Sequence, residues 1–371
     1  MRSRLAVLPW VILLLPFDFF VGLGLLFGEI FASLRRSVRP PRGTDLSLSL
    51  KKTAAVVIVN WDGKHLLAEC LPSVIDAVNY AGGKHEILVV DNGSTDGSVE
   101  FLKQRFPEVR VLALDHNHGF GGGNNRGVEE VHSDIVVFLN NDMVVDRDFL
   151  NPLLRVLEDP SVFAVTSQIF FSDPSRRRQE TGKTRARFER GFVYFWHDEI
   201  QPGEESLKTI SVFWAGGGSC AVDRRKFLAI GGFDPLYAPF YVEDADISYQ
   251  AWKRGWKTLL VPASHVVHRH RSTSKKKFGE RFVENTIRRN TYLFIWKNVT
   301  DVSLLFEHVT NLPRTHMGGM LQNGAGFECQ AFIRAVLRLP AAVTKRISCS
   351  PYYLLSDHPC DSVGRVEGVW S

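Results

Sequence analysis

The sequence predicts an α/β fold in which helices flank a mainly parallel sheet on both faces. From residue 53 onward, short β-branched apolar runs alternate with stretches of helical spacing, the pattern typical of such a sheet. Polar residues follow directly after four of the strand-like runs, at Asn60, Asp91, His116 and Asn140. Ligands bind at the carboxyl ends of strands in open parallel sheets, so this edge is the expected site.

The first half of the sheet can be placed element by element. Apolar runs predict strands at residues 54–59, 86–90, 109–114 and 135–139. Residues 65–78 carry apolar side chains at helical spacing, and Pro72 inside them predicts a kink or a late start. Further helices are expected to open near Ser98 and Asn124.

The alternation weakens after Asp142. The patterns predict a Gly-rich strand at 214–222, a helix at 244–254, a strand at 258–261, an amphipathic helix at 278–296 and a helix at 329–347. The last of these mixes apolar and basic residues, a composition that suits a helix on a membrane surface and equally a helix packed on the domain.

The N-terminal segment is apolar from residue 5 to residue 28 apart from Asp18. At about 1.5 Å per residue it could span a bilayer core of about 30 Å, but Asp18 and two prolines also favour a re-entrant or interfacial anchor. A cleaved signal peptide is less favoured, because no A-x-A site follows. Arginines are more frequent after this segment than before it, which predicts the cytoplasmic side for the rest of the chain.

These patterns divide the chain into four parts. We expect a membrane-associated segment at 1–34, a linker at 35–52, a catalytic domain at 53–300 and a tail at 301–371 that contains an amphipathic helix. Charged residues at 23% and hydrophobic residues at 44% of the 371 positions exclude a disordered chain and a multi-span membrane protein.

The net charge of +5 is too small to predict nucleic-acid binding. Positive charge is concentrated in residues 171–190 and 268–281, which predicts an anionic ligand or a membrane surface. Arg176, Arg177 and Arg178 lie in the first of these patches, and we expect them to face lipid phosphates. The five cysteines form no CxxC pair, as expected of free thiols in a reducing compartment.

Two motifs after strands have residues suited to a nucleotide. Asp91, in VVDNGSTDGS, can accept hydrogen bonds from a base or a ribose, although a plain capped turn would look the same. GFGGGNNRG, at residues 119–127, offers close backbone approach and amides for phosphate. It follows the third strand rather than the first, which disfavours a dehydrogenase.

Three further motifs carry groups that can bind a metal or move a proton. Asn140, Asn141 and Asp142 end a strand with oxygen ligands for Mg²⁺ or Mn²⁺, unless they form only an Asx turn. The segment 243–246 places three carboxylates at a helix start, where one could act as general base and all could simply cap the helix. His268 precedes a basic loop and is either structural or part of a metal or diphosphate site.

Six motifs in the same order resemble glycosyltransferase family 2, the inverting nucleotide-sugar transferases of GT-A fold. The resemblance covers residues 54–297 and is closest to bacterial rhamnosyl- and galactofuranosyltransferases. The motifs are VIVNWDG, VVDNGSTDGS, GFGGGNNRG, FLNND, GGFDPLYAPFYVEDADIS and HVVHRHRSTS.

The resemblance implies a role for each matching residue. Asp244 would be the general base, with Glu243 beside it, and Asp142 and His268 would hold Mg²⁺ or Mn²⁺. Asn140 stands where many members carry Asp. The processive Q-x-x-R-W signature is interrupted by Gly255 between Arg254 and Trp256, which favours a single transfer. The residues that would contact the nucleotide sugar are Asn60, Asp91, Asn92, Gly122, Asn125, Asn141, Gly217 and His268.

The implied reaction moves one sugar from a dTDP-, UDP- or GDP-linked donor to a glycan or a polyprenyl-diphosphate-linked glycan. It would take place at the cytoplasmic face of the cell membrane, in cell-surface polysaccharide synthesis, without nucleic acid. Two alternatives are a sugar nucleotidyltransferase and a non-catalytic sugar- or membrane-binding protein on a transferase fold. The first would need a Gly-rich basic loop after the first strand, and residues 60–63 are too short for one.

Overall fold

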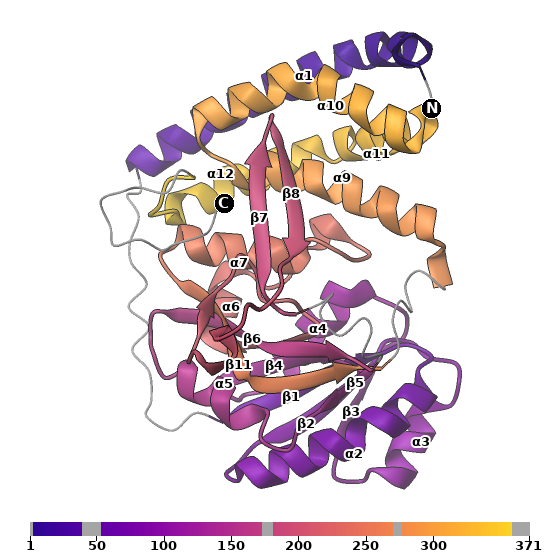
Figure 1. The fold of residues 1–371 in the computed structure, drawn as a ribbon, viewed down its shortest axis with the longest axis vertical. Coiled ribbons are helices and arrows are strands. Elements are labelled where there is room, and N and C mark those ends of the chain that lie inside the picture. The colour runs from indigo at the N-terminus through magenta and orange to yellow at the C-terminus, as the bar shows by residue number, and fades with distance from the viewer. Residues whose placement is uncertain (1–2, 39–52, 173–180, 270–276, 358–371) are drawn as a thin grey trace.

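A sheet flanked by helices and a separate helical layer make up the fold in a computed structural model (Figure 1). The structure describes residues 3–38, 53–172, 181–269 and 277–357. Most of the predicted linker, the patch Arg176–Arg178, residues 271–276 of the basic loop and Cys360 lie outside these residues. The predicted α/β architecture is confirmed.

The main sheet has nine strands, eight of them in the order β3-β2-β1-β4-β10-β6-β11-β5. β1 to β4 are parallel to one another, β10 and β5 are antiparallel to their neighbours, and β9 pairs with β11. The strands are β1 (Ala54–Asn60), β2 (Glu86–Asp91), β3 (Arg110–Ala113), β4 (Ile135–Asn140), β5 (Met143–Val145), β6 (Val162–Phe171), β9 (Ile210–Ser211), β10 (Ser219–Asp223) and β11 (Lys257–His268).

Successive side chains of β1 point to opposite faces of the sheet, and because they are apolar on both faces, helices cover both. Val56 belongs to the apolar cluster that includes residues of α2 (Lys64–Ala81), α3 (Ser98–Arg105) and α5 (Leu150–Val156). Val57 belongs to the cluster on the other face, which includes residues of α4 (Gly119–Glu130), α6 (Arg224–Ile230) and α7 (Glu243–Lys253). A Cβ on Gly127 would lie 2.5 Å from Val57, so glycine lets α4 sit directly on the sheet. α2 begins at Lys64 and contains Pro72, so the predicted late start is wrong.

Several elements differ from the sequence expectation. α4 begins at Gly119 rather than near Asn124, and the strand expected at 214–222 begins only at Ser219. The strand β6 and the hairpin of β7 (Thr184–Glu189) and β8 (Phe192–His197) were not predicted. The hairpin rises from the sheet toward the helical layer (Figure 1) and packs against it.

The helical layer contains α1 (Arg4–Val38), α9 (Glu280–Asn298), α10 (Val302–Asn323), α11 (Ala325–Val336) and α12 (Leu339–Cys349). The single helix expected at 329–347 is therefore two helices. α1 lies lengthwise over α10 and α12 (Figure 1). Cβ atoms on Gly24 and Gly28 would lie 3.0 Å from Leu339 and 2.9 Å from Val343, so small residues allow this contact.

A buried polar network explains the acidic residue in the apolar helix α1. Asp18 Oδ1 lies 2.9 Å from His316 Nε2 on α10, and His316 Nδ1 lies 3.1 Å from Glu328 Oε1 on α11. Arg288 completes the network with a 3.0 Å ion pair to Glu328. Asp18 thus has a direct partner within the protein, His316, which fixes the face of α1 that points inward.

Candidate active site

Asn60, at the end of β1, organises the first part of the site. Its amide nitrogen donates to Asp91 Oδ2 at 3.2 Å and to Ser98 Oγ at 3.0 Å, and its Oδ1 accepts from Asn141 Nδ2 at 2.8 Å. Asp91 Oδ1 accepts from the Ser94 amide at 3.0 Å. The carboxyl ends of β1, β2 and β4 therefore meet in one hydrogen-bonded cluster, as the sequence predicted.

Asn92 and Asn125 position loops through paired hydrogen bonds. Asn92 donates to Asn117 Oδ1 at 3.0 Å and accepts from the His118 amide at 2.9 Å, which holds the loop before α4. Asn125 donates to the Phe233 carbonyl at 2.8 Å and accepts from the Phe233 amide at 2.9 Å. Both side chains form hydrogen bonds with other groups of the protein. They would therefore affect a nucleotide indirectly, by holding the backbone of the loops that contact it.

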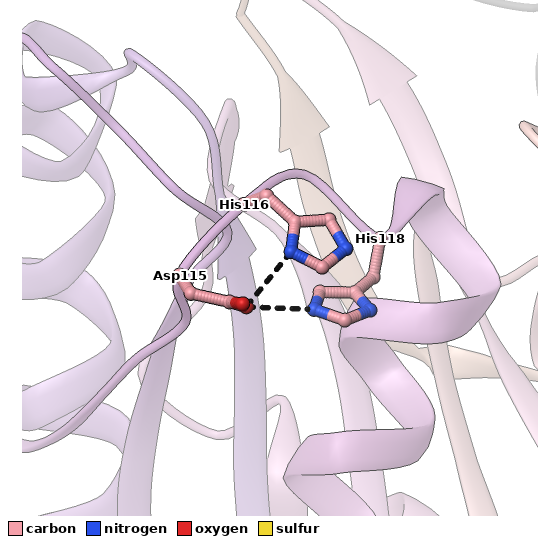
Figure 2. Close-up of side chains that lie close together, drawn as sticks. All are labelled: Asp115, His116 and His118. Atoms are coloured by element: carbon pink, nitrogen blue, oxygen red, sulfur yellow. Dashed lines mark hydrogen bonds and ion pairs between the residues drawn. The ribbon is translucent and has the colours of Figure 1, made fainter.

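The loop before α4 also brings together Asp115, His116 and His118 (Figure 2), of which the sequence singled out only His116. Asp115 Oδ1 lies 2.9 Å from His116 Nδ1 and 3.3 Å from His118 Nε2, and these hydrogen bonds lower the pKa of Asp115. The two rings stack with centroids 3.9 Å apart and planes 29° apart. Both ring nitrogens point at the same carboxylate oxygen, so hydrogen bonds within the loop account for this arrangement.

The end of β4 and the end of β11 meet at Asp142 and His268. Asp142 Oδ2 lies 3.0 Å from His268 Nε2, and the Asp142 carboxylate is buried. Its other oxygen, Oδ1, has no hydrogen-bond partner among the described residues. Backbone pairing of His268 with Met143 in β5 fixes this contact between residues 126 positions apart.

These residues fit a divalent cation. A buried carboxylate oxygen without a partner is costly unless a proton donor or a cation satisfies it. Asp142 and His268 offer the oxygen and nitrogen ligands that Mn²⁺ accepts, and oxygen ligands also suit Mg²⁺. The Asn140 amide lies beside Gly218, close to the same strand end.

The three acidic residues of helix α7 differ in burial and in hydrogen-bond partners. Asp246 is buried and accepts from Lys297 Nζ and Asn298 Nδ2, both at 2.7 Å, and so belongs to the packing with α9. Asp244 is partly exposed and accepts from the Gly217 amide at 3.2 Å. Glu243 is buried, and its Oε2 has no partner among the described residues. Asp244 is therefore the carboxylate that solvent or substrate can reach.

Burial of Glu243 and the neighbouring Asp244 raise the pKa of Glu243 to about 8, and desolvation also raises the pKa of Asp244. At neutral pH the Glu243 carboxyl is thus protonated and Asp244 carries the charge of the pair. This division suits Asp244 to accept a proton.

Glu243→Gln should stabilise the protein increasingly as pH rises. The ordinary pKa of 4.5 applies to the unfolded chain, so wild type loses stability between about pH 4.5 and 8, by about 1.4 kcal/mol per unit. Glutamine carries no such loss. Urea unfolding at pH 5 and pH 8 should show the two proteins nearly equal at the lower pH and the variant more stable at the higher; parallel behaviour would contradict the assignment.

Two glycines join the acidic helix to the strand end. The backbone amide of Gly217 donates to the Asp244 carboxylate, and the carbonyl of the next residue, Gly218, accepts from the backbone amide of Asn140 at 2.9 Å. A Cβ on Gly217 would lie 2.8 Å from the Phe120 ring. The sequence pointed to Gly217 as a sugar contact, and the structure places it between Asp244 and the ring of Phe120.

Sequence reasoning missed an aromatic contact across the site. Phe278, just before α9, stacks on Trp61 after β1, with ring centroids 5.9 Å apart, and contacts Phe240 at 5.2 Å. Lys277 Nζ lies 3.6 Å from the Trp61 ring centroid. Residues 217 positions apart thus connect the nucleotide side to the loop before α7, and no local pattern signals such a pair.

Comparison with known proteins agrees with this geometry. Residues 55–227 match the family described as "Glycosyl transferase family 2". The chain is 25% identical over 272 residues to N-acetylglucosaminyl-diphospho-decaprenol L-rhamnosyltransferase of Mycobacterium tuberculosis, covering 62% of this chain and 85% of that protein. It is 26% identical over 270 residues to N-acetylgalactosaminyltransferase 7 of Drosophila melanogaster, covering 67% of this chain but only 45% of that protein.

Two solved structures share the fold. GalNAc-T7 with UDP, GalNAc and Mn²⁺ has a TM-score of 0.53 and 21% identity, covering 67% of this chain and 48% of that one. TarS from S. aureus in complex with UDP-GlcNAc has a TM-score of 0.53 and 13% identity, covering 81% and 89%. The predicted GT-A architecture is confirmed. Residues 55–227 of the chain thus belong to glycosyl transferase family 2, whose enzymes transfer a sugar from a nucleotide sugar.

Proposed function

We propose that the chain transfers a single sugar with inversion and that Asp244 is the general base. One observation carries the proposal: the adjacent residues Gly217 and Gly218 contact Asp244 and Asn140, respectively. The proposed proton acceptor and the proposed cation-binding strand end would therefore flank one short segment. A sugar held against that segment would have its leaving group on one side and its acceptor on the other.

The residues have distinct tasks in this proposal. Asp244 takes the proton from the acceptor hydroxyl as the oxygen attacks the anomeric carbon, and the bond to the diphosphate breaks on the opposite face. Glu243 stays protonated and keeps the negative charge on Asp244. Asp142 and His268 would hold the divalent cation, which when bound stabilises negative charge on the diphosphate. The cluster of Asn60 and Asp91 would hold the nucleoside.

We propose a lipid-linked glycan as the acceptor. The support is the mycobacterial relative, whose name describes transfer of rhamnose to N-acetylglucosaminyl-diphospho-decaprenol, and the apolar helix α1. The donor would be dTDP-, UDP- or GDP-linked, and the product would enter a cell-surface polysaccharide.

The outward face of α1 supports attachment to a membrane. Among the described helices, α1 alone is long and apolar enough to cross a bilayer, with a third of its most apolar window buried. Its inner face is held by Asp18–His316 and by a 2.6 Å ion pair between Glu29 and Arg346. We propose that α1 lies flat on the cytoplasmic leaflet, which flotation with phospholipid vesicles tests. The exposed large apolar residues are Leu5, Leu8, Trp10, Ile12, Leu13, Leu15, Phe19, Phe20, Leu26, Phe27, Ile30, Phe31, Leu34 and Val38.

Donor hydrolysis tests the proposed function directly. Detergent-solubilised protein incubated with a panel of nucleotide sugars should release one nucleotide in the presence of Mn²⁺ or Mg²⁺ and none with chelator. Asp142→Asn should lower this release by about 10²-fold or more, because it removes the one carboxylate at the proposed cation site. Asp148→Asn, on the surface before α5, is the control. Chelator-resistant release, or full activity of Asp142→Asn, would contradict the metal assignment.

A further inference from the structure

Three arginines gather where α9, α11 and α12 meet. Arg289 Nη2 donates to the Ala238 carbonyl at 2.7 Å, and Arg338 Nη1 lies 3.4 Å from the same oxygen. Arg334, one turn before Arg338, donates to Asn285 Oδ1 at 3.0 Å. Burial together with Arg338 and Arg334 lowers the pKa of Arg289 to about 9, so the three positive charges act on one another.

The cluster lacks a neutralising acid. None of Arg289, Arg334 and Arg338 forms an ion pair with a carboxylate anywhere in the described part of the chain. Their hydrogen-bond acceptors there are neutral carbonyl and amide oxygens. Arg289 is buried, whereas the other two are half-exposed. Buried or half-buried positive charge of this kind is normally paired, and guanidinium groups bind phosphate through matched pairs of hydrogen bonds.

The position of the cluster connects the site to the membrane-facing helix. On one side, Arg338 donates to the Leu236 carbonyl at 3.1 Å, in the loop that leads into Glu243 and Asp244. Asn290, next to Arg289, holds the same loop through the carbonyls of residues 237, 240 and 241. On the other side, Leu339 contacts α1 at Gly24.

We propose that Arg334 and Arg338, supported from below by Arg289, bind the diphosphate of a lipid-linked acceptor. The prenyl chain would extend along the apolar outer face of α1, and the sugar would reach Asp244 over the loop of residues 236–241. This assignment rests on the proposed function. It gives the chain a separate anion site for the acceptor, apart from the donor diphosphate at Asp142 and His268.

Binding of farnesyl diphosphate in non-ionic micelles tests the site. The measurement is made with chelator present, so that the donor site holds no cation, and titration calorimetry gives the affinity. The double variant Arg334→Gln/Arg338→Gln should bind at least tenfold more weakly than wild type, with UDP binding in Mn²⁺ unchanged. Arg225→Gln, an exposed arginine on α6, is the matched control and should bind like wild type.

Three further results decide the assignment. Arg334→Lys/Arg338→Lys keeps the charge and should bind better than the glutamine pair; equal loss would overturn a role for charge. Inorganic pyrophosphate should bind wild type more weakly than farnesyl diphosphate; equal binding with the same sensitivity would assign a soluble phosphate instead. If the glutamine pair does not fold, Arg334→Gln alone replaces it.

An affinity of the glutamine variant for farnesyl diphosphate equal to that of wild type would refute the site, independently of whether donor hydrolysis is observed.

Discussion

Asp244→Asn is expected to lower kcat for sugar transfer by about 10²–10⁴-fold, the contribution of a positioned general base. The amide oxygen can still accept from the Gly217 amide, which now lies 3.2 Å from Asp244 Oδ2, so the local geometry should persist. It cannot take a proton from the acceptor hydroxyl. Steady-state transfer rates together with calorimetric binding of the donor nucleotide would separate chemistry from binding.

The matched control is Asp76→Asn, because Asp76 is an exposed carboxylate on α2 paired only loosely with Arg147 at 3.5 Å. It should change neither kcat nor nucleotide affinity. Loss of nucleotide affinity in parallel with kcat would show that Asp244 serves binding rather than proton transfer. If the kcat of Asp244→Asn stays within about threefold of wild type, another residue must act as the general base, and Glu243 would be tested next.

Asp246→Asn, two positions along the same helix, should instead destabilise the fold by about 3–5 kcal/mol, the usual cost of breaking a buried ion pair. Its carboxylate accepts from Lys297 and Asn298 at 2.7 Å and from the Tyr237 hydroxyl at 2.7 Å. Removing the charge leaves the buried Lys297 with Asp234 alone as counter-ion. Denaturant unfolding at neutral pH measures the change.

Asp148→Asn again supplies a surface comparison, with an expected change within about 0.5 kcal/mol. The variant at 246 should retain a measurable kcat at low temperature where it is still folded. An unchanged unfolding midpoint would mean that Lys297 is satisfied by Asp234, and the tie between α7 and α9 would have to rest on apolar packing.

The two aspartates show how far the sequence could lead. The order of motifs placed Asp244 at a helix start near the sheet edge, and the alternation of strands and helices before residue 142 was confirmed. Those predictions succeed because parallel strands buried on both faces read as short continuous apolar runs. The pattern offered no means to separate the roles of Asp244 and Asp246. The difference lies in Lys297 and Asn298, about fifty residues further on.

The remainder of the site depends on contacts between distant segments. The stacking of Trp61 on Phe278 and the gathering of Arg289 with Arg334 and Arg338 join segments that share no local period. Of the hairpin β7–β8, Thr184–Glu189 does alternate charged residues with Thr, Ala and Phe, a strand signal that was overlooked, whereas Phe192–His197 is aromatic or apolar in five of six positions and shows no period of two. Periodicity reports which side of an element is buried, but it does not report what covers that side.

The network of Asp18 and His316 has a consequence for synthesis of the chain. These residues are 298 positions apart, so at 5–20 residues per second the partners of α1 emerge from the ribosome roughly 15 to 60 s after α1 itself. During that interval none of the helices α10, α11 and α12 exists to cover it. α1 is thus translated long before the helices that cover it, and its apolar surface must be accommodated by its surroundings until those helices arrive.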